Sequence, residues 1–517
     1  MLKPKSPQSS FYGSYLYDRI IPQDHLLRKI NQVVDFSFVN ELVKDRYTPD
    51  FGRPAEDPEF MLRLCLLQYL YGDSDRKVVE NAGVNLAYKF FLGLAVDEEV
   101  PDDTTISYFR ATRLGEDKFR LVFENIVRQC IHKGLVTGKS QIIDSTHIVA
   151  DMAVNSLTGL VLMCRQNVLK TVARQSPQTA QKLGMKDLQF TKQDRFRRME
   201  EGLEQEIEAA KVLLDGVTNE LKQGSLKVTP ELQKDLALLE KAVADREEGA
   251  TDRLISPVDP DARAGKKTHK SWTGYKGHLV VEEESEIIAA VETTPGNTED
   301  GASLKPLLKQ QEKAFSLKPE ELSGDKAYGS GANLELLEAK GISGHISLSG
   351  KFNHIGKGLF TVDDFSYDEA SDMLTCPGGH TARYRHSANY HKEMVKRNGF
   401  VFQFYPPLCN ECGLKIKCHP GSKGRTVAIS YYHPLYKQMK ERMATEEGQA
   451  AYRNRYKIEH KIADLARYCG MRRCRYRGLA RAGIHTLLAA IVSNVKRMAK
   501  LLWKVTDPLQ IQGAMAV

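Results

Sequence analysis

Apolar side chains in the first quarter of the chain are spaced as they are in amphipathic helices. Leu62, Leu66 and Leu70 follow one another at helical intervals, and Val78 continues the same spacing. Apolar residues that return every three to four positions gather on one face of a helix, and other elements must cover that face. The pattern predicts that residues 13–137 are helical.

One short segment in this region combines a turn, a cap and a basic end. Pro101-Asp-Asp-Thr-Thr105 indicates a turn and an N-cap, and the helical run Ile106-Ser-Tyr-Phe-Arg-Ala-Thr-Arg113 follows it. A short helix that opens with Thr and Ser and ends in Arg suits the second helix of a helix-turn-helix, in which Arg110 and Arg113 would contact DNA. An ordinary capped helix has the same pattern, so both interpretations stay open.

After Gly138 the pattern changes to strands that alternate with helices. Runs rich in β-branched residues and bounded by turn residues are typical of strands. The predicted strands are Ser140–Val149, Tyr275–Glu282, Glu286–Thr294, a short run ending at Asp325, and Gly344–Leu348. The predicted helices are Asp300–Phe315, Asn333–Lys340, 434–468 and 484–503. This order indicates an α/β core.

Two segments interrupt the alternation. Residues 156–250 are highly charged and have apolar residues at helical spacing, which predicts a helical insertion with a hairpin over 203–248 that breaks near Gly224 and Pro230. Packing against a partner and simple filler explain this insertion equally well. Residues 351–424 are rich in Gly and Cys and are expected to form a second, smaller insertion.

The predicted organisation has six parts. They are a helical N-terminal DNA-binding domain at 1–137, the first part of the core at 138–155, the helical insertion at 156–250, the central part of the core at 251–350, the Cys-rich insertion at 351–424, and the C-terminal part of the core with basic helices at 425–517. A chain of 517 residues with 41% hydrophobic residues is long and apolar enough for several globular domains.

No apolar run approaches the roughly 20 residues that span a bilayer. The N-terminus, Met1-Leu-Lys-Pro-Lys-Ser, lacks the apolar stretch of a secretory signal. We therefore expect a cytoplasmic protein with no membrane partner.

Positive charge is concentrated near the C-terminus. The whole chain has a net charge of +8, whereas residues 451–504 alone carry 14 basic and 2 acidic residues, with Tyr interleaved. Such a density favours a surface for a polyanion, although a solvated helix face could carry the same charges. The candidate DNA contacts here are Arg455, Lys461, Arg467, Arg472, Arg473 and Arg475.

A second basic segment lies at 262–277 and leads into a predicted strand. Lys266, Lys267, Lys270 and Lys276 could hold phosphates, and Trp272 or Tyr275 could stack on a displaced base. A flexible loop is an equally good explanation.

Three acidic residues stand where acidic residues are not expected. Asp144 follows the apolar pair Ile142-Ile143 in a predicted strand, and Asp325 closes another strand, with Gly329 and Gly331 after it leaving room for a ligand. Glu459 lies in a basic helix. Three carboxylates from separate elements can hold two divalent cations roughly 4 Å apart, the arrangement that cleaves phosphodiesters. These residues are the predicted catalytic and metal-binding groups.

Nine cysteines in a chain expected to be cytoplasmic argue against a disulfide framework. Four of them cluster with the Cys-x2-Cys spacing that lets two thiolates reach one Zn²⁺. The predicted structural zinc ligands are Cys376, Cys409, Cys412 and Cys418, with His380 or His419 as substitutes. The zinc would fold an insertion too small to own a core; free thiols or a redox pair are the alternative.

The three acidic motifs resemble those of a known family. Asp144-Ser-Thr, Asp325-Lys-Ala-Tyr-Gly and Tyr452-x2-Arg455-x3-Glu459 are similar to the motifs of the DDE transposases of bacterial insertion sequences. Pro54–Lys139 also resembles the helical domain that precedes the catalytic core in that family.

The resemblance implies an RNase H-like mixed-sheet core and two Mg²⁺ or Mn²⁺ ions at Asp144, Asp325 and Glu459. It also implies cleavage of double-stranded DNA at terminal inverted repeats, joining to target DNA, and a homodimer on DNA. The family usually has Lys seven residues after the Glu, where this chain has Ala466 and then Arg467. A metal-dependent nuclease without strand transfer, or a domesticated zinc-containing DNA-binding protein, is the alternative.

Overall fold

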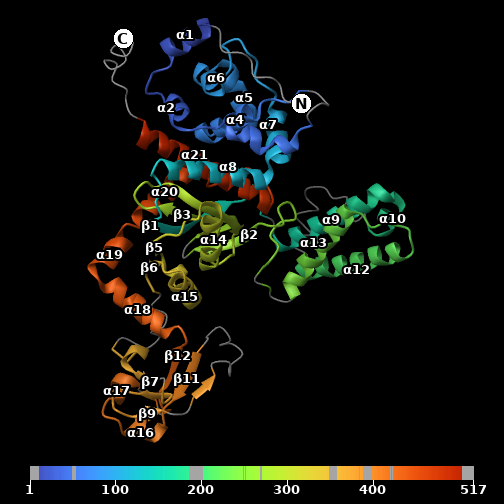
Figure 1. The fold of residues 1–517 in the computed structure, drawn as a ribbon. Coiled ribbons are helices and arrows are strands. Elements are labelled where there is room, and N and C mark those ends of the chain that lie inside the picture. The colour runs from blue at the N-terminus through green and yellow to red at the C-terminus, as the bar shows by residue number, and fades with distance from the viewer. Residues whose placement is uncertain are drawn as a thin grey trace, which may run out of the picture.

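The computed structural model describes residues 11–48, 54–154, 156–184, 202–247, 250, 252–267, 270–348, 358–368, 370–382, 385–387, 399–419, 421 and 423–503. Its centre is a sheet between two helical layers, with the N-terminal helices above it in Figure 1. A bundle of helices projects to one side of the sheet, and a small β-rich unit lies at the far end from the N-terminal helices.

The central sheet is mixed. Its strand order is β2-β3-β1-β5-β6, with β4 also paired to β3. β1 runs antiparallel to β3 and parallel to β5, and β5 runs parallel to β6. The strands are β1 Ser140–Val149, β2 Arg263–Lys267, β3 Lys270–Glu282, β4 Ile288–Pro295, β5 Glu321–Gly324 and β6 Ser343–Ile346. This mixed α/β architecture confirms the predicted RNase H-like fold class.

The region predicted to be helical before β1 is helical. Its elements are α1 Phe11–Ile20, α2 Leu26–Val33, α3 Phe38–Leu42, η1 Lys44–Arg46, α4 Pro58–Tyr71, α5 Asp75–Val84, α6 Leu86–Leu92, α7 Asp103–Tyr108, the π-helical η2 Phe109–Leu114, and α8 Gly115–His132. Polar caps begin several of these helices: the Asp102 carboxylate accepts from the Thr104 amide at the start of α7. The first ten residues lie outside the described residues.

One helix from the end of the chain joins this region to the sheet. α21 Leu479–Leu502 is buried around most of its circumference, as expected of a core helix. Its Asn494 side chain accepts from the Ile288 amide at 2.8 Å and donates to the Ile288 carbonyl at 2.9 Å. The N-terminal helices, α21 and one face of the sheet share a single apolar core.

The opposite face of the sheet is covered by α14 Leu304–Phe315, preceded by η4 Asp300–Ser303, and by α15 Gly331–Ala339. The long predicted helix 434–468 is three helices, α18 His433–Ala444, α19 Glu446–Arg453 and α20 Tyr456–Tyr468. It breaks at Thr445 because that hydroxyl caps α19 by accepting from the Gly448 amide at 3.0 Å.

The helical insertion has a core of its own. The predicted hairpin is present as α12 Leu203–Lys222 and α13 Pro230–Glu247, which pack with α9 Leu157–Gln175 and α10 Pro177–Lys182 (Figure 1). A buried ion pair between Arg165 and Glu206 ties α9 to α12. Residues 185–201 and 248–249 of the predicted insertion lie outside the described residues.

Among the described residues, the Cys-rich insertion has two small three-stranded sheets, and the second sheet includes a strand at 426–430, past the predicted boundary at 424. Its elements are η7 Val362–Asp364, β7 Ser366–Asp368, β8 Met373–Thr375, β9 Thr381–Ala382, β10 Arg385–Ser387, β11 Gly399–Gln403, α16 Pro406–Glu411, α17 Lys415–Cys418 and β12 Thr426–Ser430. Seven buried apolar residues, among them Phe365, Phe402 and Phe404, form a core. The prediction that this insertion is too small to own a core was therefore wrong.

Within the described residues, no helix has both the length and the apolarity needed to cross a membrane.

Candidate active site

Two neighbouring strands bring two carboxylates close together. β5 is parallel to β1, and its last residue, Gly324, pairs with Ile143. Asp144 is the next residue of β1 and Asp325 is the first residue after β5, and the two strands lie roughly 5 Å apart. Burial raises the pKa of Asp144 above its ordinary value, and the nearby charge of Asp325 raises it further.

Both oxygens of the Asp144 carboxylate have a partner. The Ser145 amide donates to Oδ1 at 2.7 Å, and Nη2 of Arg455 lies 3.3 Å from Oδ2. These two contacts favour the ionised form and oppose the effect of burial on the pKa. Asp144 is thus a buried carboxylate with one direct cationic partner among the described residues.

Asp325 caps the short helix η5 Lys326–Tyr328, since its Oδ1 accepts from the Ala327 amide at 2.8 Å. Its side chain is partly exposed at the strand end. Gly329 and Gly331 do not leave room for a ligand, contrary to the prediction. A Cβ at Gly331 would meet the Tyr432 ring at 2.0 Å, and one at Gly329 would contact Leu348, so these glycines permit close packing.

Glu459 lies in the first turn of α20 and is exposed. It stands four residues after Arg455, so the two side chains share a helix face. Ile458 and Leu465 on the buried side of α20 join the main core. Among the described residues, no three His, Cys, Asp or Glu side chains stand in a geometry ready to hold a metal ion. The structure pairs Asp144 with Asp325, and the convergence of Glu459 with them stays a prediction.

Cationic side chains surround the outer end of β1. Lys267 lowers the pKa of Asp144, so it lies within electrostatic reach of that carboxylate. Nη1 of Arg472 is 2.7 Å from Nε2 of His147, whose ring packs on Trp272 with centroids 5.0 Å apart. Burial, followed by Arg472, Lys267 and Lys270, lowers the pKa of His147 to about 4, so this ring is neutral at pH 7.

Two family models match the chain. A transposase domain of the DUF772 type matches residues 15–112, and a transposase DDE domain matches residues 242–495. The chain belongs to the DDE transposases of insertion sequences. The DDE match includes Asp325 and Glu459, whereas Asp144 lies outside both matches, so its assignment depends on the strand register. Searches of curated proteins and of solved structures found no match.

Membership in this family supports DNA as the substrate of the transposase, cleavage of DNA as its general activity, and dependence on divalent metal ions. The basic residues differ in how they could meet such a substrate. Lys266, Lys267, Lys270, Arg467 and Arg473 are exposed. β2 and β3 form a hairpin that carries the three lysines, where the sequence had indicated a loop.

Other predicted DNA contacts of the transposase lie inside the protein. Arg110 is 6% exposed and its Nη2 lies 2.7 Å from Oδ2 of Asp75. Lys461 is 4% exposed, with Nζ 3.7 Å from Glu286, and burial lowers its pKa. Tyr275 is fully buried, so it cannot stack on a base.

Two further predicted contacts are held by neighbouring aromatic rings. The Arg475 guanidinium lies 4.8 Å from the Tyr69 ring and donates to the Asp73 carbonyl. The Arg113 guanidinium lies 4.4 Å from the Tyr47 ring. Cation–π contacts of this kind stabilise packing, and they leave less of each guanidinium free for a phosphate.

The sequence analysis did not identify Tyr328, which lies near Asp144 and Asp325, the two residues that we call the acidic pair. The Tyr328 hydroxyl is buried and has no hydrogen-bond partner among the described residues. Burial raises the pKa of Tyr328 well above its ordinary value, and Asp144, Asp300 and Asp325 raise it further. Asp300 forms an ion pair of 2.7 Å with Lys276. The place of Tyr328, three residues after Asp325, is the signal that could have identified it.

The four clustered cysteines of the transposase approach one another. A Cβ at Gly378 would lie 3.1 Å from Sγ of Cys412 and 3.6 Å from Sγ of Cys376. The Arg425 amide donates to Sγ of Cys409 at 3.5 Å. Burial raises the pKa of Cys418, Arg425 lowers it, and the thiols of the other three cysteines raise it, so Cys418 lies within electrostatic range of Cys376, Cys409 and Cys412.

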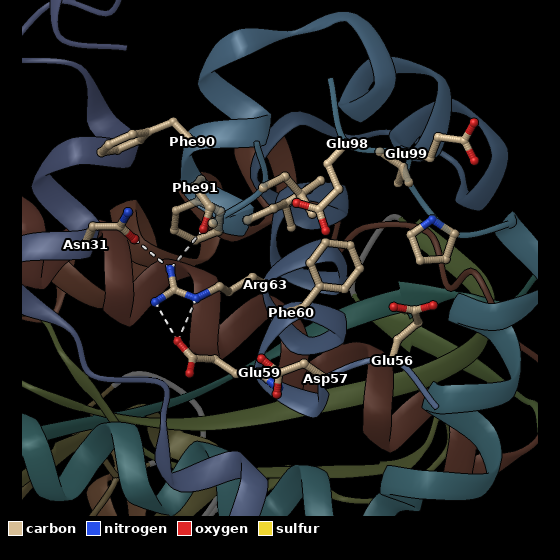
Figure 2. Close-up of a pocket in the computed structure, with 15 residues that line it drawn as sticks. Asn31, Glu56, Asp57, Glu59, Phe60, Arg63, Phe90, Phe91, Glu98 and Glu99 are labelled. Atoms are coloured by element: carbon tan, nitrogen blue, oxygen red, sulfur yellow. Dashed lines mark hydrogen bonds and ion pairs between the residues drawn. The ribbon is translucent and has the colours of Figure 1, made fainter. Parts of the chain in front are cut away.

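A cavity of about 520 Å³ lies among the N-terminal helices, away from the acidic pair (Figure 2). Arg63 lies along it, held by Glu59 at 2.9 Å and by Oδ1 of Asn31 at 2.6 Å. Glu56, Asp57, Glu98 and Glu99 also line this cavity. These carboxylates outnumber Arg63, so the charge of the lining opposes the approach of phosphate.

Proposed function

We propose that the transposase binds the terminal inverted repeats of its element, cleaves DNA there by two-metal-ion catalysis, and joins the freed ends to target DNA. The observation that supports this most directly is the strand register that brings Asp144 and Asp325 side by side. The third acidic residue, Glu459, is on the helix whose first turn is anchored to Asp144 through Arg455.

The acidic pair suits a divalent cation. Two carboxylates on adjacent strands, one of them buried with a raised pKa, carry an excess of negative charge that a cation would relieve. Asp144, Asp325 and Glu459 would hold Mg²⁺ or Mn²⁺ ions. Bound there, the ions would activate the attacking oxygen and stabilise the leaving oxygen of the phosphodiester.

In this proposal, exposed basic side chains position the DNA. Lys266, Lys267 and Lys270 on the β2–β3 hairpin, with Arg467 and Arg473 nearer the C-terminus, are exposed and suited to phosphates. Arg472 contributes charge next to β1. Trp272 already packs on His147, so a base would have to extend that stack. Arg110 and Lys461 are left out of this surface because they are buried in ion pairs.

We propose that Cys376, Cys409, Cys412 and Cys418 hold a structural Zn²⁺. Four thiols within electrostatic range, from a turn and two short helices, form a suitable donor set for zinc, and no disulfide competes for them.

We also propose that the transposase acts as a homodimer on DNA, since two ends must be held together for joining, and that it is cytoplasmic.

The function is tested with DNA that carries the flanks of the coding region. Wild-type protein with Mg²⁺ is expected to cut at inverted repeats and join the ends to a target plasmid. Asp144→Ala, Asp325→Ala and Glu459→Ala are each expected to lose cutting by about 100-fold or more and to retain binding, because these groups act on the reacting phosphate. Arg473→Ala is the matched control and should weaken binding instead.

Three other outcomes of this experiment would contradict the proposed function or one of its assignments. Cutting without joining would identify a nuclease, and binding without cutting by the wild-type protein would identify a regulator. If Asp144→Ala abolished binding, the catalytic assignment of Asp144 would be wrong.

A further inference from the structure

Arg455 forms an ion pair with Asp144, whose carboxylate is a metal ligand in the proposed function. Its Nη2 contacts Oδ2 of Asp144 at 3.3 Å, and Oδ1 already accepts from the Ser145 amide. The side chains of Arg455 and Asp144 are 14% and 10% exposed. Because both are largely withdrawn from water, each depends on the other for compensation of its charge.

The guanidinium of Arg455 has donors to spare. Nη1 donates to the Tyr452 hydroxyl at 3.3 Å, and the guanidinium lies 5.3 Å from the centre of the Tyr452 ring. Nε is buried and has no hydrogen-bond partner among the described residues. A guanidinium binds a planar or tetrahedral oxyanion best through two parallel N–H groups, and the single contact with Asp144 leaves this capacity unused.

Asp144 and Arg455 could therefore each bind another group more strongly than they bind one another. Asp144 lies beside Asp325, so a divalent cation could be shared by two carboxylates, whereas Arg455 serves only one. Arg455 is the N-cap residue of α20, and Glu459 follows it by four positions in the first turn of that helix. A phosphate brought to the acidic pair would lie next to the basic end of this helix.

We propose that Arg455 is a positioning residue that couples metal binding to DNA binding. It neutralises Asp144 while the acidic pair is empty. When Asp144 takes a divalent cation, Arg455 is released and its N–H groups turn to a phosphate of the DNA. Metal and DNA then each strengthen the binding of the other by the same factor, as linkage requires. This inference rests on the proposed metal site.

The first measurement is metal affinity without DNA, from the EPR signal of free Mn²⁺. Arg455→Gln is expected to bind Mn²⁺ about fivefold tighter than wild type, because a competing cation has been removed. Arg455→Lys keeps a competing cation and should stay close to wild type. Arg473→Gln, a nearby exposed Arg with no contact to Asp144 in the structure, is the matched control and should leave Mn²⁺ affinity unchanged.

The second measurement is the affinity for a short labelled duplex of arbitrary sequence, with and without Mn²⁺. Wild type should gain about fivefold from Mn²⁺, and both Arg455 variants should lose most of this gain, Arg455→Lys because it lacks the two-pronged donor. Arg473→Gln should bind the duplex more weakly by the same factor in both conditions.

Two results would overturn the inference, and they differ in scope. If Mn²⁺ binds wild type but not Asp144→Asn, and Arg455→Gln shows unchanged or weaker Mn²⁺ affinity, the ion pair is only structural and the proposed function survives. If Mn²⁺ binding is the same in wild type and Asp144→Asn, the metal site itself is refuted, and the coupling is refuted with it.

Discussion

Burial decides the role of each basic residue in this transposase. Arg110 and Arg473 are both arginines in segments that the sequence marks as basic or DNA-binding. Arg110 is buried against Asp75, with its guanidinium 4.7 Å from the Tyr476 ring, whereas Arg473 is exposed. A buried guanidinium is retained for its ion pair and its packing, and an exposed one is free to meet phosphate.

Arg110→Ala is expected to destabilise the protein by about 3 kcal/mol, because it leaves the Asp75 carboxylate without its cation and removes the contact with Tyr476. Urea denaturation measures this loss. Arg473→Ala, the exposed counterpart, should change stability by no more than about 0.5 kcal/mol and should weaken DNA binding. Reduced DNA affinity of a fully stable Arg110→Ala protein would contradict the structural role.

At the scale of elements, the Cys-rich insertion combines an apolar core with a proposed zinc site. Its three-stranded sheets share a core of seven buried apolar residues among those described. Cys376 lies in the turn after β8, Cys409 in α16, Cys412 directly after α16, and Cys418 at the end of α17. Cys376, Cys409 and Cys418 pack against that core. Zinc would therefore tighten a unit that already has apolar packing, in contrast to a small zinc finger, which unfolds without metal.

The double variant Cys409→Ser/Cys412→Ser is expected to lose the bound zinc and to make the insertion more sensitive to proteolysis, while the central sheet remains folded. Metal analysis of the purified protein and limited proteolysis measure the two effects. Cys65→Ala, at a buried cysteine in α4, is the control and should retain zinc. Unchanged zinc content in the double variant would remove this assignment.

At the scale of the whole molecule, the N-terminal helices and the central sheet are joined by one apolar core that includes α21. His485 in α21 is fully buried, and its Nδ1 lies 2.8 Å from the Tyr69 hydroxyl of α4. His278 in β3 is also buried. Burial lowers the pKa of both histidines to about 4, so the folded protein holds them neutral.

This arrangement predicts a loss of stability in mild acid. Between the ordinary pKa of His and about 4, the unfolded chain binds protons that the folded protein excludes, so stability falls as the pH falls through this range. Each histidine contributes at most about 1.4 kcal/mol per pH unit. Urea denaturation between neutral and mildly acidic pH measures the slope, which His485→Asn should reduce. An unchanged slope in that variant would show that His485 is not responsible.

The local elements, and the chemistry that their side chains carry, could be predicted from the order of the amino acids. Helical spacing identified the N-terminal helices, β-branched runs identified β1, β3 and β4, and the spacing of motifs identified Asp144, Asp325 and Glu459 as candidates. These properties depend on neighbours along the chain, which are visible in a sequence. The same reasoning failed at Thr445, where a single cap divides what looks like one helix.

Which of those residues lie next to one another could not be predicted without the three-dimensional packing of the chain. The pairing of Gly324 with Ile143 makes Asp325 the neighbour of Asp144, although 181 positions separate them, and Arg455 reaches Asp144 from a third segment. Depth below the surface, which separates Arg110 and Lys461 from Arg473, likewise results from the packing of distant elements. Contacts between remote segments depend on which apolar faces pack together in the core. Local sequence patterns do not predict that packing.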